Sequence, residues 1–167
     1  MTTHSPELPA GARAAVITVS DRSHGGARHD ESGPLLSRLL AECGFAVEPV
    51  VVVPDEVAEI AAALRAAVGT GVEVVITTGG TGFSPRDVTP EATRTVLERE
   101  APGLVEALRQ YRRDEVPTTI LSRAVAGTAG GSIIVNLPGS VGGVRDGVEV
   151  LRPVIGHAVA QLRGGDH

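Results

Sequence analysis

Three short apolar runs, each ending at polar or glycine-rich residues, constrain the fold of this chain more than any other feature. They lie at residues 12–20, 47–53 and 72–78 and are rich in β-branched side chains, which is typical of buried strands. Apolar residues at helical spacing follow the first run up to Gly44 and the second run from Val57 to Val68. Strands that alternate with helices predict a mainly parallel sheet covered by helices.

The second half of the chain extends this pattern. A helix is predicted from Pro90, with Thr89 as its N-cap, and a short helix after the break at 101–103. Two β-like runs around the glycines of 127–131 predict a hairpin, and a 3.6-residue rhythm from Val144 to Leu162 predicts a final helix. We therefore expect a three-layer α/β/α sandwich with a mostly parallel central sheet and an antiparallel edge hairpin. The expected division is one domain at 12–163, with tails at 1–11 and 164–167.

Composition excludes several classes of function. All 15 basic residues are arginines, which rules out a phosphate-loop lysine, a Schiff-base lysine and a pyridoxal-phosphate anchor. The net charge of −5 argues against a general nucleic-acid binder. The single cysteine, Cys43, cannot form an internal disulfide and lies on a leucine face, so it is interpreted as a core residue. Because neither a secretory signal nor a membrane-spanning apolar run is present, we expect a cytoplasmic protein without a membrane partner.

The third apolar run leads directly into a glycine loop, ITTGGTGFSPRDVTPE at residues 76–91. Glycines at a strand end allow the backbone N–H groups to approach a phosphate closely, and the neighbouring threonines add hydroxyl donors. The loop matches neither the Walker pattern nor a dinucleotide fingerprint. A tight turn that needs glycine only for its geometry is the alternative. The loop predicts a phosphate cradle formed by Thr78, Gly79, Gly80, Thr81 and Gly82.

Two carboxylates follow strand ends near this loop. Asp87 lies five residues after Gly82, and Asp55 follows the second apolar run. Carboxylates beside phosphates suggest Mg²⁺, which binds a few carboxylate oxygens together with substrate phosphates and water. The alternatives are that Asp55 caps a helix and that Asp87 is a turn residue. Asp21, after the first apolar run, is a third candidate.

A second polar turn, NLPGS at 136–140, would lie over the same end of the sheet if its strand joined in parallel. A plain strand-to-helix turn with Ser140 as the cap accounts for it equally well. His24, His29 and His157 lack metal-ligand spacing and are not expected to have a chemical role.

Seven segments together resemble the MogA/MoaB family of molybdenum cofactor biosynthesis proteins. They are VITVSDR at 16–22, DESG at 30–33, VVPDE at 52–56, TTGGTGFSPRDVTPEAT at 77–93, PGL at 102–104, PTTILSR at 117–123 and NLPGS at 136–140. The resemblance runs in order from about residue 13 to 163. One departure is Val141 after Ser140, where the family often has proline.

The resemblance implies a homotrimer that transfers AMP from Mg·ATP to the terminal phosphate of molybdopterin and releases pyrophosphate. The product would pass to a molybdate-inserting, MoeA-like partner. Asp55 and Asp87 are then the catalytic residues and the Mg²⁺ ligands. The substrate-binding residues are Asp21, Thr78, Gly79, Gly80, Thr81, Gly82, Ser122, Arg123, Asn136, Pro138 and Gly139.

Two rival functions are compatible with the same motifs. A non-catalytic, MoaB-like trimer would bind molybdopterin or act as a scaffold, although it would not need both Asp55 and Asp87. A different phosphate-cleaving reaction on a nucleotide, as in the distantly similar competence-damage-type proteins, is the second rival.

Overall fold

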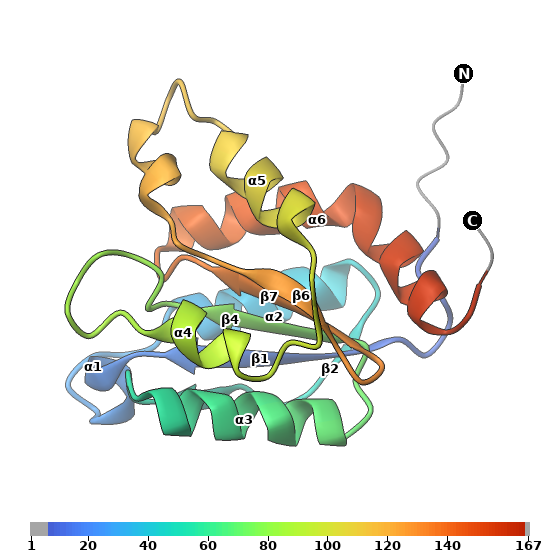
Figure 1. Ribbon diagram of the computed structural model, residues 1–167, viewed down its shortest axis with the longest axis horizontal. Helices are drawn as coiled ribbons and strands as arrows, with labels where there is room; N and C mark the ends of the chain where they lie inside the picture. Colours follow the sequence, from blue (N-terminus) through green and yellow to red (C-terminus); the bar gives the residue numbers. More distant parts are fainter. Residues whose placement is uncertain (1–6, 166–167) are drawn as a thin grey trace.

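A central sheet lies between two layers of helices in the computed structural model, which describes residues 7–165 (Figure 1). The strands are β1 (Arg13–Val19), β2 (Ala46–Val47), β3 (Val51–Val53), β4 (Val74–Thr78), β5 (Arg99–Glu100), β6 (Ala126–Ala129) and β7 (Ser132–Leu137). The helices are α1 (Asp21–His24), α2 (Ser32–Glu42), α3 (Val57–Gly69), α4 (Thr89–Arg94), α5 (Pro102–Gln110) and α6 (Val141–Leu162), with a 3₁₀ turn, η1, at Pro117–Leu121.

The strand order is β2-β1-β4-β7-β6-β5, with β3 also paired to β1. Strands β2, β3, β1, β4 and β7 run parallel to one another, whereas β6 is antiparallel to β7 and β5 is antiparallel to β6. The mostly parallel sheet and the edge hairpin are thus confirmed. Because β7 pairs in parallel with β4, the turn after β7 lies at the same end of the sheet as the glycine loop.

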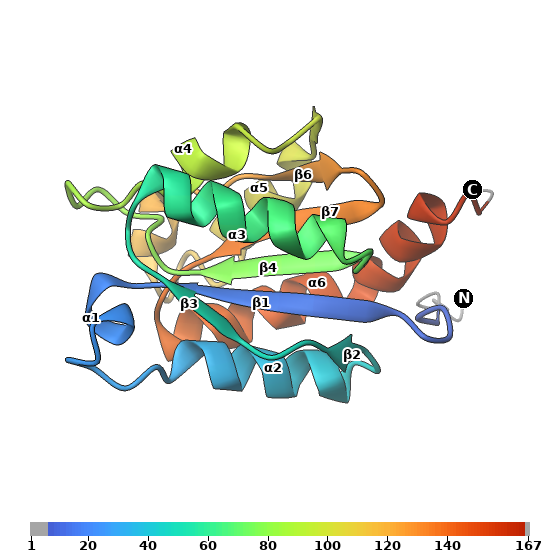
Figure 2. The ribbon, with the colours of Figure 1, turned by 90° about the horizontal axis from the view of Figure 1, so that it is seen from below.

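The two faces of the sheet form separate cores. One core is built from alternate residues of β1, β4 and β7 against α2, α5 and α6, and the other from the remaining residues of these strands against α3 and α4. Figure 2 shows α3 on one side of the sheet and α2 and α6 on the other. Strands β4 and β7 are buried along their whole length, which explains why residues 72–78 are almost uniformly apolar.

Several predicted elements differ from the structure. The run 47–53 is not one strand, because Pro49 lacks an N–H and separates β2 from β3. Residues 21–24 form a one-turn helix whose cap, Ser20, accepts a hydrogen bond from the Ser23 amide at 3.2 Å. Gly127 lies inside β6 and not in the hairpin turn. Glycine is needed there because a Cβ would lie 2.1 Å from the Arg99 carbonyl oxygen of β5.

Only part of each predicted tail is described, because residues 1–6 and 166–167 lie outside the described residues. Leu8 packs against the core beside α2, and Arg163 donates a hydrogen bond to the Ala10 carbonyl at 3.0 Å. Within residues 7–165, no helix has the length and apolar character needed to cross a bilayer.

Candidate active site

The candidate site lies where the carboxyl ends of β1, β3, β4 and β7 meet. Thr18, Thr78 and Leu137 are in register on adjacent strands. The loops that follow these strands therefore leave the sheet side by side, as is typical of ligand sites in parallel α/β folds.

The glycine loop has its carbonyl groups engaged by the protein. The Gly79 carbonyl accepts from Thr89 Oγ1 at 2.9 Å, and the Gly80 carbonyl accepts from the Thr89 amide at 3.1 Å. The carbonyls of the next two residues accept from Arg123, one from its amide at 2.9 Å and one from Nε at 2.7 Å. By contrast, the N–H groups of residues 80–82 have no hydrogen-bond partner within residues 7–165. This arrangement leaves three consecutive donors available to an anion.

Close packing explains why glycine is needed at the start of this loop. Gly79 has a φ of +106°, and a Cβ there would lie 2.3 Å from the Val19 carbonyl oxygen. Gly139, in the turn after β7, approaches the Gly79 Cα so closely that its own Cβ would lie 3.2 Å from it. The two loops thus touch through bare backbone.

Threonine hydroxyls tie the loops together. Thr78 donates from Oγ1 to the Pro138 carbonyl at 2.8 Å. The predicted capping role of Thr89 is wrong, because Val88 is the N-cap of α4 and the buried Thr89 hydroxyl donates to Gly79. Thr81 is buried beside them. Thr78 and Thr89 therefore hold the cradle in shape.

Two cavities meet at this loop, one of about 670 Å³ and one of about 480 Å³. The larger cavity is mainly apolar, and Phe83, Leu108, Tyr111, Val116 and Leu121 line it. The smaller cavity is mainly polar and is lined by residues that include Ser20, Arg28, His29, Asp30 and Asp55. Gly80, Asp87, Gly139 and Ser140 line both. The junction of the two cavities therefore lies at the glycine loop.

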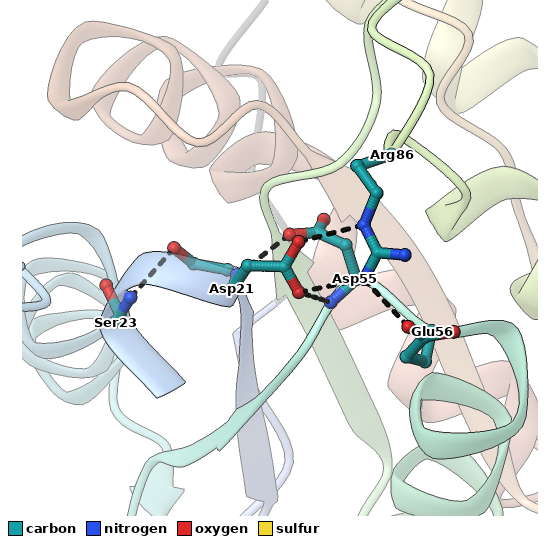
Figure 3. A network of polar contacts seen from close by, with 6 residues as sticks. Asp21, Ser23, Asp55, Glu56 and Arg86 are labelled. Carbon is teal, nitrogen blue, oxygen red and sulfur yellow. Dashed lines mark hydrogen bonds and ion pairs between the residues drawn. The ribbon is translucent and has the colours of Figure 1, made fainter. Parts of the chain in front are cut away.

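The backbone amides of Asp21 and Asp55 each donate to the carboxylate of the other residue (Figure 3). The Asp21 amide donates to Asp55 Oδ2 at 2.8 Å, and the Asp55 amide donates to Asp21 Oδ1 at 2.9 Å. Arg86 donates to both carboxylate oxygens of Asp21, at 3.0 and 3.2 Å, and to Glu56 Oε1 at 2.8 Å. The carboxylate of Asp21, predicted to bind substrate, is thus engaged by the protein. The alternative in which Asp55 caps α3 is not observed, because Glu56 is the N-cap residue.

The pKa values of Asp21 and Asp55 are shifted in opposite directions. Hydrogen bonds from Arg86 and from the Asp55 amide lower the pKa of Asp21. Burial raises the pKa of Asp55, and the charges of Asp21 and Asp87 add to this effect. A bound cation would relieve this unfavourable charge on Asp55.

Asp87 is both a turn residue and a cavity residue. Its amide donates to the Ser84 carbonyl at 2.9 Å, and its Oδ2 accepts from the Ser84 amide at 3.1 Å. Asp55 and Asp87 line the same polar cavity. Residues 7–165 contain no group of three or more His, Cys, Asp or Glu side chains that could hold a metal. Two carboxylates that line one cavity with the glycine loop nevertheless fit Mg²⁺, which can take its other ligands from phosphates and water.

Arg123 stabilises the loop between Gly82 and Asp87. Besides the bond to Gly82, its Nη2 donates to the Asp87 carbonyl at 2.7 Å, and its Nη1 pairs with Glu91. Ser122 lines the apolar cavity, and its Oγ accepts from the Ala124 amide at 3.3 Å.

The turn after β7 supplies the opposite wall. Asn136 is fully buried, and its amide group donates to Thr77 and Thr93 at 2.9 and 3.0 Å and accepts from the Val125 amide at 3.1 Å. Pro138 and Gly139 line the apolar cavity. Ser140 caps α6, since its Oγ accepts from the Gly143 amide at 3.0 Å.

Sequence reasoning missed some contributors. Arg86 and Thr89 lie within the quoted motif, but their partners are 65 and 10 residues away and only the folded chain reveals them. The apolar cavity wall from α5 and η1 was also missed, although Leu104, Leu108 and the run 116–121 carried a weak apolar signal.

Comparisons with known proteins place this site in context. Residues 15–157 match the family described as "Probable molybdopterin binding domain". The chain is 37% identical over 165 residues to the "Molybdopterin adenylyltransferase" of Pyrococcus furiosus, with 96% of each chain covered. It is 39% identical to a "Molybdenum cofactor biosynthesis bifunctional protein" of Chlorobaculum tepidum, covering 93% of this chain and 50% of that one. The chain spans about half the length of two of the curated relatives it matches.

A solved molybdopterin biosynthesis protein from Mycobacterium abscessus superposes with a TM-score of 0.88 at 46% identity, covering 93% of this chain and 98% of that one.

Proposed function

Because this chain belongs to the MogA/MoaB family of molybdenum cofactor biosynthesis proteins, we propose that it transfers AMP from ATP to the terminal phosphate of molybdopterin. Support comes from a sequence identity of 37%, over nearly the full length of both chains, to a relative named molybdopterin adenylyltransferase. The reaction also fits the site, which offers donors for phosphates and carboxylates for a cation but contains no lysine.

One observation carries the proposal: the N–H groups of residues 80–82, which have no partner within residues 7–165, belong to residues that line the apolar cavity, and Gly80 also lines the polar one. Such a junction suits a reaction between two phosphate-bearing molecules, each held on its own side. Asp55 lies on the polar side, and Asp87 borders both cavities.

The proposed chemistry is an in-line displacement. An oxygen of the molybdopterin phosphate forms a bond to the α-phosphorus of ATP, the bond to the bridging oxygen of the β-phosphate breaks, and pyrophosphate leaves with that oxygen. Such reactions are accelerated by positioning and by stabilisation of charge, with no protein nucleophile required. The N–H groups of residues 80–82 would bind the phosphate oxygens, and the threonine contacts keep these donors in place.

Asp55 and Asp87 would hold the Mg²⁺ of the nucleotide. When bound, the ion would neutralise charge on the phosphates. The raised pKa of Asp55 fits this role, because a carboxylate that is poorly stabilised by the protein gains from a cation.

The other predicted ligands are proposed in narrower roles. Arg123 has donors committed to the carbonyls of Gly82 and Asp87, so it would shape the cradle. Ser122, Pro138 and Gly139 would contact substrate in the apolar cavity, which they line. The side chain of Asn136 is occupied by protein partners and would support the cavity floor.

We further propose a cytoplasmic homotrimer that passes its product to a molybdate-inserting partner. Support for a partner comes from the bifunctional relatives, since this chain covers only half of their length. The trimer rests on the family resemblance.

The test is formation of adenylylated molybdopterin by purified protein with ATP and Mg²⁺, followed by mass spectrometry and by release of pyrophosphate. Parallel reactions omit molybdopterin or Mg²⁺. Product that requires both would support the transferase. Tight molybdopterin binding without product would assign the chain to the non-catalytic group, whereas nucleotide cleavage without molybdopterin would favour the phosphate-cleaving alternative.

A further inference from the structure

We propose that Arg86 is a positioning residue that fixes the loop carrying Asp87 against the loops carrying Asp21 and Asp55. This inference rests on the proposed function, because it concerns the geometry of the two carboxylates assigned to Mg²⁺.

The contacts of Arg86 span three loops (Figure 3). Its guanidinium comes from the loop between β4 and α4 and donates to Asp21, after β1, and to Glu56, after β3. The pairing with Asp21 uses both carboxylate oxygens, through Nε at 3.0 Å and Nη2 at 3.2 Å. A planar fork of donors can make this pattern, whereas the ammonium of lysine presents a single point charge.

Arg86 reaches Asp55 through Asp21. Asp21 Oδ1 accepts from Arg86 and also from the Asp55 amide at 2.9 Å. The Asp21 amide donates in turn to Asp55 Oδ2 at 2.8 Å. The Asp21 carboxylate that Arg86 orients therefore fixes the backbone of Asp55, while the Asp21 backbone fixes the Asp55 carboxylate.

Arg86 also restrains the loop that carries Asp87, its neighbour in the chain. Residues 83–86 are exposed, so the tip of this loop packs against little of the protein. Arg123 holds the base of the loop through the carbonyls of Gly82 and Asp87, and Arg86 holds the tip. One guanidinium thus sets the spacing between Asp55 and Asp87.

The role is distinct from general stability. The Arg86 side chain is 56% exposed, and exposed ion pairs contribute little to folding. By contrast, a displacement of about 1 Å in a reacting geometry lowers the rate on the order of 100-fold. We therefore expect loss of turnover without loss of the fold.

The experiment compares Arg86→Met, Arg86→Lys and the matched control Arg94→Met. Arg94 is 54% exposed and pairs with Glu100 at 3.6 Å, and neither residue lines either of the two cavities. For Arg86→Met we expect kcat to fall roughly 10- to 100-fold, with the KM for molybdopterin and the unfolding midpoint close to those of wild type. Arg86→Lys should not restore kcat, and Arg94→Met should leave it unchanged.

A second readout does not require catalysis. Amide hydrogen exchange, followed by NMR, should be faster at Asp21 and Asp55 in Arg86→Met than in wild type or Arg94→Met. Asp21→Asn combined with Arg86→Met should lower kcat no further than the more severe single variant, because both act on one chain of contacts.

Restoration of kcat by lysine, or unchanged exchange at Asp21 and Asp55 in Arg86→Met, would overturn the positioning role. A wild-type protein that forms no adenylylated product would contradict the proposed function alone. In that case the exchange rates still decide the role of Arg86.

Discussion

Replacing Gly79 by alanine tests the physical reason for the glycine loop. Gly79 has a φ of +106°, where a non-glycine residue costs about 1–3 kcal/mol. The new Cβ would also lie 2.3 Å from the Val19 carbonyl oxygen, so the loop must move. Movement would weaken two hydrogen bonds of the residue, to Leu137 at 3.0 Å and from Thr89 at 2.9 Å, each worth about 1 kcal/mol.

We therefore expect Gly79→Ala to lower the free energy of unfolding by about 3–5 kcal/mol, summing these terms. Urea denaturation measures this, and two glycines serve as controls. Gly71 has a φ of +82°, and a Cβ on it would meet no atom within 4 Å, so Gly71→Ala should cost only the conformational term, about 1–3 kcal/mol. Gly69 is helical and equally open, so Gly69→Ala should stabilise by about 0.5–1 kcal/mol.

The comparison between Gly79→Ala and Gly71→Ala tests whether the close approach of the Val19 carbonyl adds to the conformational cost at Gly79. Equal costs would refute the close approach of the Val19 carbonyl as the reason for glycine at this position. We also expect Gly79→Ala to bind ATP less tightly than Gly71→Ala, because the loop that moves carries the N–H groups that we propose bind phosphate.

Three further substitutions test the roles assigned above. Asp55→Asn should abolish transfer yet raise the thermal unfolding midpoint at pH 7. Burial raises the pKa of this carboxyl, so the ionised form destabilises the fold once the pH rises through that pKa. The increase in midpoint should therefore vanish at a pH low enough to protonate Asp55 in the wild type. Arg123→Met, which removes two bonds to the loop carbonyls, should lower stability by about 2 kcal/mol in urea and raise the KM for ATP. Thr89→Val should lower the free energy of unfolding by about 1–3 kcal/mol, because it leaves the Gly79 carbonyl unpaired. Thr89→Ser keeps the hydroxyl and should retain most of this stability in the same urea denaturation assay.

The fold could be predicted from the sequence because its strongest elements are buried on both faces or amphipathic. The largely apolar run 72–78 contains the central strand β4, and the helical rhythm from Val144 to Leu162 corresponds to α6. Among the elements that were missed, α1 and β5 are short and polar, and neither contributes a residue to the two cores. Their conformations depend on caps and on strand pairing, which leave little trace in hydropathy.

The grouping of the candidate residues could be predicted from the sequence, but their hydrogen-bond partners could not. The glycine loop, Asp55 and Asp87 were expected at one end of the sheet because each follows a parallel strand, and the structure places all three beside the same polar cavity. Whether each polar side chain faces the ligand or the protein could not be predicted. Asp21 and Arg123, expected to contact substrate, have hydrogen-bond partners within the protein, Arg86 and the loop carbonyls, and these partners are distant in sequence.

The most direct test of the central claim is a single-turnover measurement of AMP transfer by Asp87→Ala beside wild type. Circular dichroism and molybdopterin binding on the same preparations establish that the variant is folded and retains its pterin site. We expect a folded variant that binds molybdopterin and forms adenylylated product at least about 100-fold more slowly, because the carboxylate organises the reacting phosphates. Full transfer by Asp87→Ala, or a variant that fails to fold, would contradict the role assigned to this carboxylate.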